Sequence, residues 1–505
     1  MGKPSRQKHQ YEYISGGQGS PTDGDDDGLI VISNRQPYRH SESGDGIEVD
    51  RPRGGLTAGL DAVMREVDGR WIAWGDGGAD RAAVDEDGCV AVPPDSDGEG
   101  YTLERIWLSD RQVEGYYYGF SNRVLWPLCH AALTRVRYDP DYWDHYRTVN
   151  RQFADAVAER IDGPTLAWFQ DYHLALAPRM VAADADDAVL AQFWHVPWPS
   201  RNVFRAAPHS RELLEGLLEN DLLGFHIPRY CANFLRCADA LLDGATVDWE
   251  SGRVFYRDAP TTVASFPMGV DADRIGRLAA APDADAAWSR LNDEHGLWDV
   301  AVAVGVDRLD YTKGIPERLR ALEYLWETHP EWRGRLTYVQ VGTESRSQIP
   351  AYRELQETVE DRIDRINDRF ETDEWTPVVY TTEMIPDRQL YGLYRRADLG
   401  VVTPLRDGMN LVAQEYVAAQ TDHDGALVIS DQAGVEGLFD GEAITVSPHE
   451  TDAVAAAVRR GLELPPGERR RRMRSLRETV SDNDLSSWLD GVFATVDDLA
   501  PDAPL

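Results

Sequence analysis

The chain has 505 residues, 42% of them hydrophobic and 15 of them tryptophan, which is enough for two or three domains with sizeable cores. Its 87 acidic and 52 basic residues give a formal net charge of −35, and this disfavours nucleic acid and anionic membranes as partners. No apolar run reaches the roughly 20 residues of a membrane span, and the start lacks the apolar core of a signal peptide. We therefore expect a cytoplasmic protein.

Only three of the basic residues are lysines: Lys3, Lys8 and Lys313. The acidic residues are spread along the whole chain, a pattern that we interpret as adaptation to a high-salt (halophilic) cytoplasm, where ions screen the self-repulsion. Because arginine supplies almost every other positive charge, we expect Lys313 to perform a task that arginine cannot.

The N-terminal part begins with a polar segment, residues 1–27, which is rich in Gly, Asp and Ser and predicts a disordered acidic leader. An apolar run over residues 29–33 predicts the first strand, and Arg35 follows its carboxyl end. A glycine pair that ends at Gly55 then opens a helix. Residues 71–110 are expected to form irregular strands and turns.

An aromatic cluster spans residues 116–130 and includes Tyr117 and Trp126. Such clusters commonly belong to a core, but Tyr, Trp and Asn together also suit a ring with apolar faces and many hydroxyl groups. The residues alone leave both interpretations open.

Three apolar runs follow, with helical patterns between them, and each run ends at a polar group. This alternation predicts a parallel, doubly wound sheet, in which ligands bind at the carboxyl ends of the strands. For each polar group taken singly, a structural hydrogen bond is the alternative. The runs and polar groups are 165–169 with Asp171 and His173, 189–194 with His195, and 222–225 with His226.

A second alternation begins near residue 300, after an Ala/Asp-rich stretch, residues 277–287, that we expect to be a linker. It predicts a second Rossmann-like domain, and a last helical stretch, 484–499, is expected to pack back on the first domain. The second set of strands is predicted near residues 300–306, 336–341, 377–382, 399–403, 426–430 and 443–447. The expected parts of the chain are therefore residues 1–27, 28–270, 271–480 and 481–505.

Positive charges follow two strands of this second domain. Arg308 and Lys313 flank a strand-to-helix turn, and they combine a planar forked donor with a compact point charge. That combination suits a diphosphate whose negative charge grows as a bond to it breaks. Arg346 follows the next strand and, together with Arg35, is suited to clamp a phosphate on a second substrate.

The segment TPLRDGMNLVAQEY, residues 403–416, predicts a turn between a strand and a helix. Asp407 lies in the turn and Glu415 about two helical turns further on, on the same side of the helix. The free amides at the start of this helix suit an anion. A capping loop followed by a surface glutamate is the alternative interpretation.

Motifs of several other enzyme classes are missing. No Gly-x-Gly-x-x-Gly joins a strand to a helix, and neither a Walker A sequence nor a Gly-x-Ser-x-Gly elbow occurs. The four cysteines have no zinc-type spacing. A nicotinamide or flavin oxidoreductase, a P-loop enzyme and a zinc site are therefore disfavoured.

Eight segments carry a resemblance to a known family: SNRQP, RGGL, GYYYGFSNRVLWPLCH, QDYHLALAP, WHVPWP, GVDRLDYTKGIPER, GTESR and TPLRDGMNLVAQEYVAAQ. In order and spacing, over nearly all of residues 29–490, they resemble the trehalose-6-phosphate synthases. The resemblance implies an α/β GT-B fold, with two Rossmann-like doubly wound parallel-sheet domains facing a cleft. It also implies retaining transfer of glucose from a nucleotide-glucose to glucose 6-phosphate, with no metal and no other cofactor.

The resemblance also implies roles for residues at matching positions. On the donor side they are Gly55, His195, Arg308, Lys313, Ile385, Asp407, Gly408, Met409, Asn410, Leu411, Val412 and Glu415. On the acceptor side they are Arg35, Tyr117, Trp126, Asp171 and Arg346. Those expected to be catalytic are Arg308, Lys313, Asp171, His195 and Asp407. The implied mechanism is front-face, with the leaving phosphate taking the acceptor's proton.

Two alternatives accompany this interpretation. One is a related transferase with another phosphorylated acceptor, such as glycerol 3-phosphate; the other is a catalytically silent regulatory homologue, which would be expected to have lost the charged set. The sequence does not distinguish UDP-, GDP- and ADP-glucose as donors, and it leaves open whether the chain forms a homo-oligomer.

Overall fold

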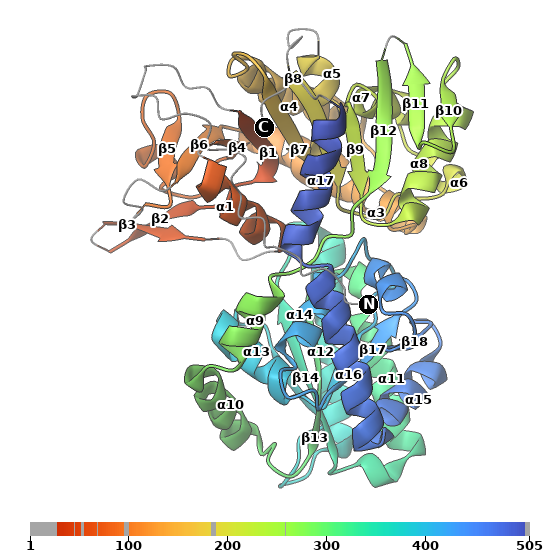
Figure 1. The fold of residues 1–505 in the computed structure, drawn as a ribbon. Helices are drawn as coiled ribbons and strands as arrows, with labels where there is room; N and C mark the ends of the chain where they lie inside the picture. Colours follow the sequence, from red (N-terminus) through yellow and green to blue (C-terminus); the bar gives the residue numbers. More distant parts are fainter. Residues whose placement is uncertain are drawn as a thin grey trace, which may run out of the picture.

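The computed structural model describes residues 28–44, 46–51, 55–67, 69–94, 100–182, 188–257 and 259–499. The predicted leader, residues 1–27, lies outside the described residues. The described chain is built around two large sheets, one in each half of the molecule (Figure 1).

The first sheet has ten strands in the described part of the chain, in the order β10-β11-β12-β9-β8-β7-β1-β4-β6-β5. The seven strands from β12 to β6 are parallel, and β10, β11 and β5 are antiparallel additions at the edges. The strands are β1 (Leu29–Arg35), β4 (Arg70–Trp74), β5 (Cys89–Val92), β6 (Tyr101–Ile106), β7 (Thr165–Gln170), β8 (Ala188–Trp194), β9 (Leu222–Phe225), β10 (Thr246–Asp248), β11 (Arg253–Tyr256) and β12 (Ala259–Ser265). A separate hairpin joins β2 (Arg39–Ser43) to β3 (Gly46–Asp50).

Both faces of this sheet are covered, which explains why its strands read as continuous apolar runs. Ile30 and Ile32 belong to the core on one face, whereas Val31 belongs to a second cluster on the other face. The helices of this half are α1 (Gly55–Val67), α2 (Asp110–Gln112), a π-helix (Val113–Leu125), α3 (Trp126–Cys129), α4 (Pro140–Ala158), α5 (Ala177–Val181), α6 (Arg201–Phe204), α7 (Ser210–Leu217) and α8 (Pro228–Leu241).

The second sheet has six parallel strands in the described chain, in the order β15-β14-β13-β16-β17-β18. Numbered from its own first strand, this is the order 3-2-1-4-5-6 of a Rossmann domain. The strands are β13 (Ala301–Arg308), β14 (Leu336–Thr343), β15 (Val378–Thr381), β16 (Leu399–Val402), β17 (Ala426–Ser430) and β18 (Ile444–Val446). The helices are α9 (Ala272–Ala279), α10 (Pro282–His295), α11 (Ile315–Thr328), α12 (Pro350–Phe370), α13 (Asp387–Arg396), α14 (Leu411–Ala419), α15 (Thr451–Glu463), α16 (Pro466–Asp482) and α17 (Leu485–Leu499).

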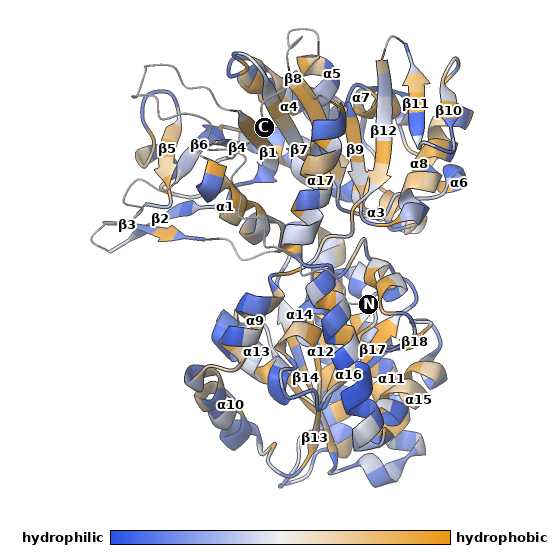
Figure 2. Cartoon of the chain, in the orientation of Figure 1, coloured by the Kyte–Doolittle hydropathy of each residue, from blue (hydrophilic) through white to orange (hydrophobic). Residues whose placement is uncertain are grey.

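The last helix, α17, leaves the second half and lies on the first sheet (Figure 1). The ring of Trp488 is 5.4 Å from that of Trp168 and 5.1 Å from that of Phe193. By contrast, α16 is mostly hydrophilic (Figure 2). Its arginines pair with acids of the same domain, as in Arg470 with Asp424.

Two sequence predictions about local structure were wrong. Residues 277–287 are no linker, because most of them belong to α9 and α10; Pro282 and two aspartates in the first turn of α10 are a helix-start signal. Residues 71–110 are also more regular than predicted, since they include β6 and most of β4, both parallel strands inside the first sheet.

Candidate active site

The two sheets each reverse their strand order at one point, and these are the points where open α/β sheets bind ligands. In the first sheet the reversal lies between β1 and β7, whose ends carry Arg35 and Asp171. In the second it lies between β13 and β16, with Arg308 at the end of β13 and Asp407 in the loop after β16.

Side chains of the two domains meet near these switch points. The guanidinium carbon of Arg346 lies 4.0 Å from the ring centroid of Trp126, and that of Arg308 lies 5.7 Å from the same ring. Arg346 also donates from Nη2 to the Tyr172 hydroxyl at 3.5 Å. The arginines of the second domain therefore stack on an aromatic residue of the first.

Arg35 reaches the same region from the first domain, where its Nη2 donates to the Tyr117 hydroxyl at 3.3 Å. Burial, followed by the positive charge of Arg346 and that of Arg35, lowers the pKa of Arg308. The like charges of these three arginines repel one another, so an anion between them would relieve the repulsion. The cluster is therefore a candidate phosphate site.

Tyr117 is buried beside this arginine cluster and stacks on His173, with the ring centroids 5.9 Å apart. Burial alone would raise its pKa, but the charges of Arg35 and Arg346 outweigh burial and lower the pKa of Tyr117 to about 8. The phenol thus responds to the local positive potential.

Several buried polar atoms near these residues have no hydrogen-bond partner in the described part of the chain. Buried polar groups are normally paired, so such a set is suited to hydrogen-bond a polar ligand. Sequence reasoning did not assign site roles to Asn34, Gln170 or His173, although they stand at the strand ends that it singled out. The atoms are Asn34 Nδ2 and Oδ1, Trp126 Nε1, Gln170 Nε2 and His173 Nε2.

Asp171 and His195, from neighbouring strand ends, are hydrogen-bonded to each other through the His195 amide, which donates to Asp171 Oδ1 at 3.2 Å. Asp171 has φ 66°, a left-handed conformation that is costly for a non-glycine residue and is typical of functional sites. Burial raises the pKa of the Asp171 carboxyl to about 6. Burial, then the nearby His226, lowers the pKa of His195 well below its ordinary value, so this ring is neutral near pH 7.

The loop between β16 and α14 is held rigidly. Asn410 has φ 77°, and its side chain both accepts from the Ala413 amide at 3.0 Å and donates to Asp407 Oδ2 at 2.9 Å. A Cβ on Gly408 would lie 2.1 Å from the carbonyl oxygen of His195, so only glycine fits where this loop meets the first domain.

Lys313, in the turn after β13, forms an ion pair with Asp407 at 2.5 Å. Both side chains are largely buried, at 14% and 15% exposure. Burial opposes the charge of Asp407, but Lys313, together with His130 and the hydrogen bond from Asn410, keeps the pKa of Asp407 below its ordinary value. The lysine and the acid that the sequence singled out separately are therefore direct partners across the second switch point.

Glu415 lies further along α14, where its charged neighbours are Asp387 and Arg274. Burial, then the nearby Asp387, raises the pKa of Glu415 to about 7, against an opposing effect of Arg274. Ile385 precedes α13, the helix on which Asp387 lies, and it packs against the same hydrophobic cluster as Leu411 and Val412 of α14. Gly55 begins α1, and its neighbours 52–54 lie outside the described residues.

Around Gly408 the predicted donor residues form one continuous segment. Met409 and Asn410 are buried, whereas Leu411 and Val412 are half-buried at the start of α14. No group of three or more metal-ligating side chains occurs in the described part of the chain, and no helix among those residues is long and apolar enough to cross a membrane.

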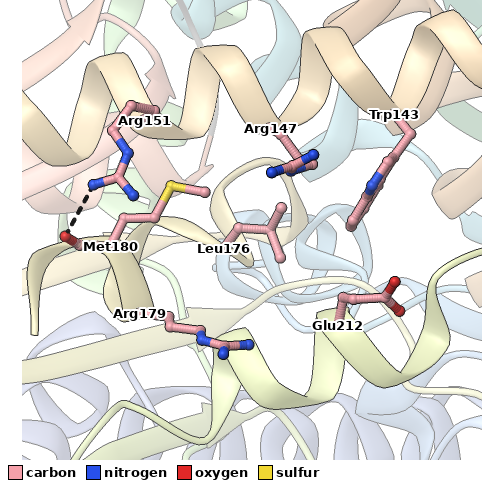
Figure 3. Close-up of a pocket in the computed structure, with 7 residues that line it drawn as sticks. All are labelled: Trp143, Arg147, Arg151, Leu176, Arg179, Met180 and Glu212. Atoms are coloured by element: carbon pink, nitrogen blue, oxygen red, sulfur yellow. Dashed lines mark hydrogen bonds between the residues drawn. The ribbon is translucent and has the colours of Figure 1, made fainter.

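A separate pocket of about 450 Å³ lies on the outside of the first domain, between α4, α5 and α7 (Figure 3). None of the predicted site residues lines it. Arg179 pairs with Glu215, and Arg151 bonds to the Met180 carbonyl and pairs with Asp155, so these two arginines already have protein partners.

Two Rossmann-like domains that meet at the carboxyl ends of their strands, with a cluster of arginines between them, have the architecture of a GT-B glycosyltransferase. Comparison with known proteins gives the same class. The sequence model of glycosyltransferase family 20 matches residues 27–498. The chain belongs to glycosyltransferase family 20, and the predicted fold class is confirmed.

Individual relatives are similar over most of the chain. The bifunctional trehalose-6-phosphate synthase/phosphatase of Thermoproteus tenax is 36% identical over 471 residues, which are 91% of this chain and 62% of that protein. The trehalose-6-phosphate synthase of Mycolicibacterium gilvum is 36% identical over 477 residues, 91% of this chain and 92% of the relative. A crystal structure of the UDP-forming alpha,alpha-trehalose-phosphate synthase of Burkholderia xenovorans in complex with glucose-6-phosphate is 32% identical and has a TM-score of 0.82, covering 93% of this chain and 99% of that one.

Proposed function

We propose that this protein transfers glucose from UDP-glucose to glucose 6-phosphate, with retention of configuration, to give α,α-trehalose 6-phosphate. The observation that carries the proposal is the arginine cluster on Trp126, to which the first domain contributes Arg35 and the second contributes Arg308 and Arg346. Relatives described as UDP-forming trehalose-phosphate synthases, one of them in complex with glucose-6-phosphate, support the choice of donor and acceptor.

The acceptor occupies the first-domain side of the cleft in this proposal. Arg35 and Arg346 bind its phosphate as charge-assisted donors. Tyr117, Trp126 and Asp171 contact the sugar, and the unpaired Trp126 Nε1 supplies a donor for a hydroxyl group. An acceptor smaller than a sugar ring, such as glycerol 3-phosphate, would leave these polar groups unsatisfied, which weakens its binding.

The donor occupies the second-domain side. Arg308 and Lys313 hold the diphosphate, Glu415 binds the ribose hydroxyls, and Ile385 contacts the base through its backbone. Asp407 and the segment Gly408–Val412 hold the glucose, with the amides at the start of α14 pointing at negative charge. Gly55 and His195 complete the site from the first domain.

Bond making and bond breaking occur on one face of the glucose ring. The bond from C1 to the diphosphate oxygen breaks, and the acceptor hydroxyl oxygen bonds to C1 from the same side. The acceptor's proton passes to the departing phosphate oxygen, so no protein base is consumed. Arg308 and Lys313 lower the barrier, because they stabilise the charge that develops on the leaving diphosphate. We expect no metal or other cofactor to take part.

The proposal also covers the compartment in which the enzyme works, a cytoplasm of high salt concentration. The net charge of −35 and the scarcity of lysine support a cytoplasm of high salt concentration. Synthesis of a disaccharide phosphate there would serve compatible-solute production.

A substrate panel tests the function. UDP-, GDP- and ADP-glucose are each combined with glucose 6-phosphate, glucose or glycerol 3-phosphate in high-salt buffer, and the product's linkage and anomeric configuration are determined by NMR. The expected result is α,α-trehalose 6-phosphate from UDP-glucose and glucose 6-phosphate. Absence of that product, or an inverted linkage, would contradict the proposal.

A further inference from the structure

Asp310 is a fully buried carboxylate in the turn after β13, between Arg308 and Lys313. Its Oδ2 accepts from Arg346 Nη1 at 2.9 Å and from the Tyr352 hydroxyl at 3.2 Å. Its Oδ1 accepts from the amide of Thr312 and from that residue's hydroxyl, both at 3.0 Å. Both oxygens are therefore saturated by neighbours within the second domain.

Arg346 is fixed by these contacts. Its side chain is only 4% exposed, its Nη1 donates to Tyr352 as well as to Asp310, and its plane lies over Trp126. Its backbone has φ 49°, a left-handed conformation. A flexible arginine with three rotatable methylenes is thus held in one orientation before any ligand arrives.

The turn that carries Asp310 also connects to the donor side of the cleft. Thr312 accepts at its carbonyl from the Leu405 amide at 2.7 Å, which joins the turn to the loop that bears Asp407. One buried carboxylate therefore links the arginine of the acceptor side to both donor-binding loops.

The presence of a negative charge here needs an explanation, because a carboxylate next to a phosphate site repels the phosphate. We propose that Asp310, assisted by Tyr352, is a positioning residue that orients Arg346 for the acceptor phosphate and fixes it in register with the donor loops. This inference rests on the proposed function. Asp310 favours binding by orienting Arg346, and this effect has to outweigh the repulsion between the Asp310 carboxylate and the acceptor phosphate.

The two effects predict opposite outcomes for Asp310→Asn, and this makes the test decisive. If Asp310 acted only through its charge, the variant would bind glucose 6-phosphate more tightly. If it positions Arg346, KM for glucose 6-phosphate rises about tenfold or more, the size of one hydrogen bond to a charged group. The rate with unphosphorylated glucose changes little, so the preference for the phosphorylated acceptor falls.

Two further variants extend the test, and the first of them keeps it informative if Asp310→Asn is poorly folded. Tyr352→Phe removes a hydroxyl that contacts both Asp310 and Arg346, and it should shift KM in the same direction. In an Arg346→Ala background, Asp310→Asn should add almost nothing, because the partner is already gone. Glu104→Gln, which breaks a buried pair with Arg70 away from the cleft, is the matched control and should alter Tm without altering the acceptor preference.

Equal losses with glucose and glucose 6-phosphate, a lowered KM, or additive effects in the Arg346→Ala background would each overturn the inference. If the wild-type enzyme transferred no glucose to glucose 6-phosphate at all, the proposed function would fail instead. The two failures are therefore distinguishable.

Discussion

Lys313 Nζ lies 2.5 Å from Asp407 Oδ2, so the lysine in the described part of the chain is paired across the switch point of the second sheet. A compact ammonium fits this largely enclosed position, whereas a planar guanidinium would need more space and a forked partner. The pair holds a positive charge close to where the donor diphosphate is proposed to lie. The Lys313 ammonium is therefore already ordered before the donor binds.

Replacing Lys313 by Ala should lower kcat about 100-fold or more, the usual order for losing one preorganised charge. Lys313→Arg should also lose most activity, although it conserves the charge, because the guanidinium cannot occupy the same position. Steady-state kinetics with both substrates saturating measures the effect, and Tm shows whether the variants fold. Near-normal turnover of either variant would contradict a role for Lys313 in leaving-group stabilisation.

Gly408 tests whether activity requires the close contact between the β16–α14 loop and the first domain. A methyl group there would lie 2.1 Å from the carbonyl oxygen of His195, so Gly408→Ala should push the β16–α14 loop away from the first domain. Misplacement of about 1 Å costs about 100-fold in rate, and we expect a loss of kcat of that order.

Gly437→Ala is the matched control for this change, because a Cβ at Gly437 meets nothing within 4 Å and the residue does not have positive φ. Its activity should equal that of the wild type. Small-angle scattering with both substrates should show closure in the control and less closure in Gly408→Ala. Full activity of Gly408→Ala would show that this contact is not needed.

Much of the site could be predicted because strand ends are visible in sequence. The runs before Asp171, His195 and Arg308 are buried on both faces of their sheets and therefore predominantly apolar, so the polar residues that follow each run mark the carboxyl edge. In a parallel sheet these edges coincide, which brings together residues far apart in sequence.

Other features could not be predicted, since they depend on partners that folding supplies. Asp310 was one acid among 87 until the structure placed Arg346 and Tyr352 against it. The pairing of Lys313 with Asp407 joins residues 94 positions apart. The helix α10 was missed because its Ala/Asp composition resembles that of a linker, although Pro282 at its start is a helix signal.

Tyr117 should report occupation of the phosphate site. Because its pKa of about 8 reflects the charges of Arg35 and Arg346, the free enzyme should contain one tyrosine that ionises near pH 8 by ultraviolet difference absorbance. Glucose 6-phosphate should raise that pKa, because its phosphate neutralises the arginines.

Two variants assign this titration. Tyr117→Phe should abolish it, and Arg35→Ala should move it toward the ordinary tyrosine value while raising KM for glucose 6-phosphate. If the titration near pH 8 persisted in Tyr117→Phe, it would belong to another tyrosine. The ionisation of Tyr117 could then not be used to detect binding at the proposed phosphate site.

Salt should stabilise the fold. Raising KCl weakens local ion pairs such as those of Glu215 with Arg179, Arg211 and Arg257, but exposed pairs are each worth about 0 to 1 kcal/mol. The repulsion of a net charge of −35 extends over the whole surface and is screened at the same time. We expect Tm to be clearly higher in about 3 M than in about 0.1 M KCl, and equal values would refute the high-salt proposal.

The stability of the protein should depend on pH through Glu415. Its pKa is raised to about 7 in the folded protein against an ordinary value of 4.5, so between these values the folded state binds more protons than the unfolded state. Stability contributed by this group is therefore present at low pH and is lost as pH rises toward 7. Glu415→Gln stays neutral, and relative to the wild type it should become more stable across this range by about 1 to 3 kcal/mol.

Paired unfolding curves of wild type and Glu415→Gln at a series of pH values, in constant salt, measure the difference. Glu354→Gln, which removes one acid at an exposed position on α12, is the matched control for the change in net charge. The same Glu415→Gln variant should raise KM for the nucleotide-glucose, because an amide is a weaker acceptor for ribose hydroxyls than a carboxylate. If the difference in unfolding free energy between wild type and Glu415→Gln did not change with pH, the pKa of Glu415 would not be raised in the folded protein. If KM for the nucleotide-glucose were also unchanged, Glu415 would not contact the donor.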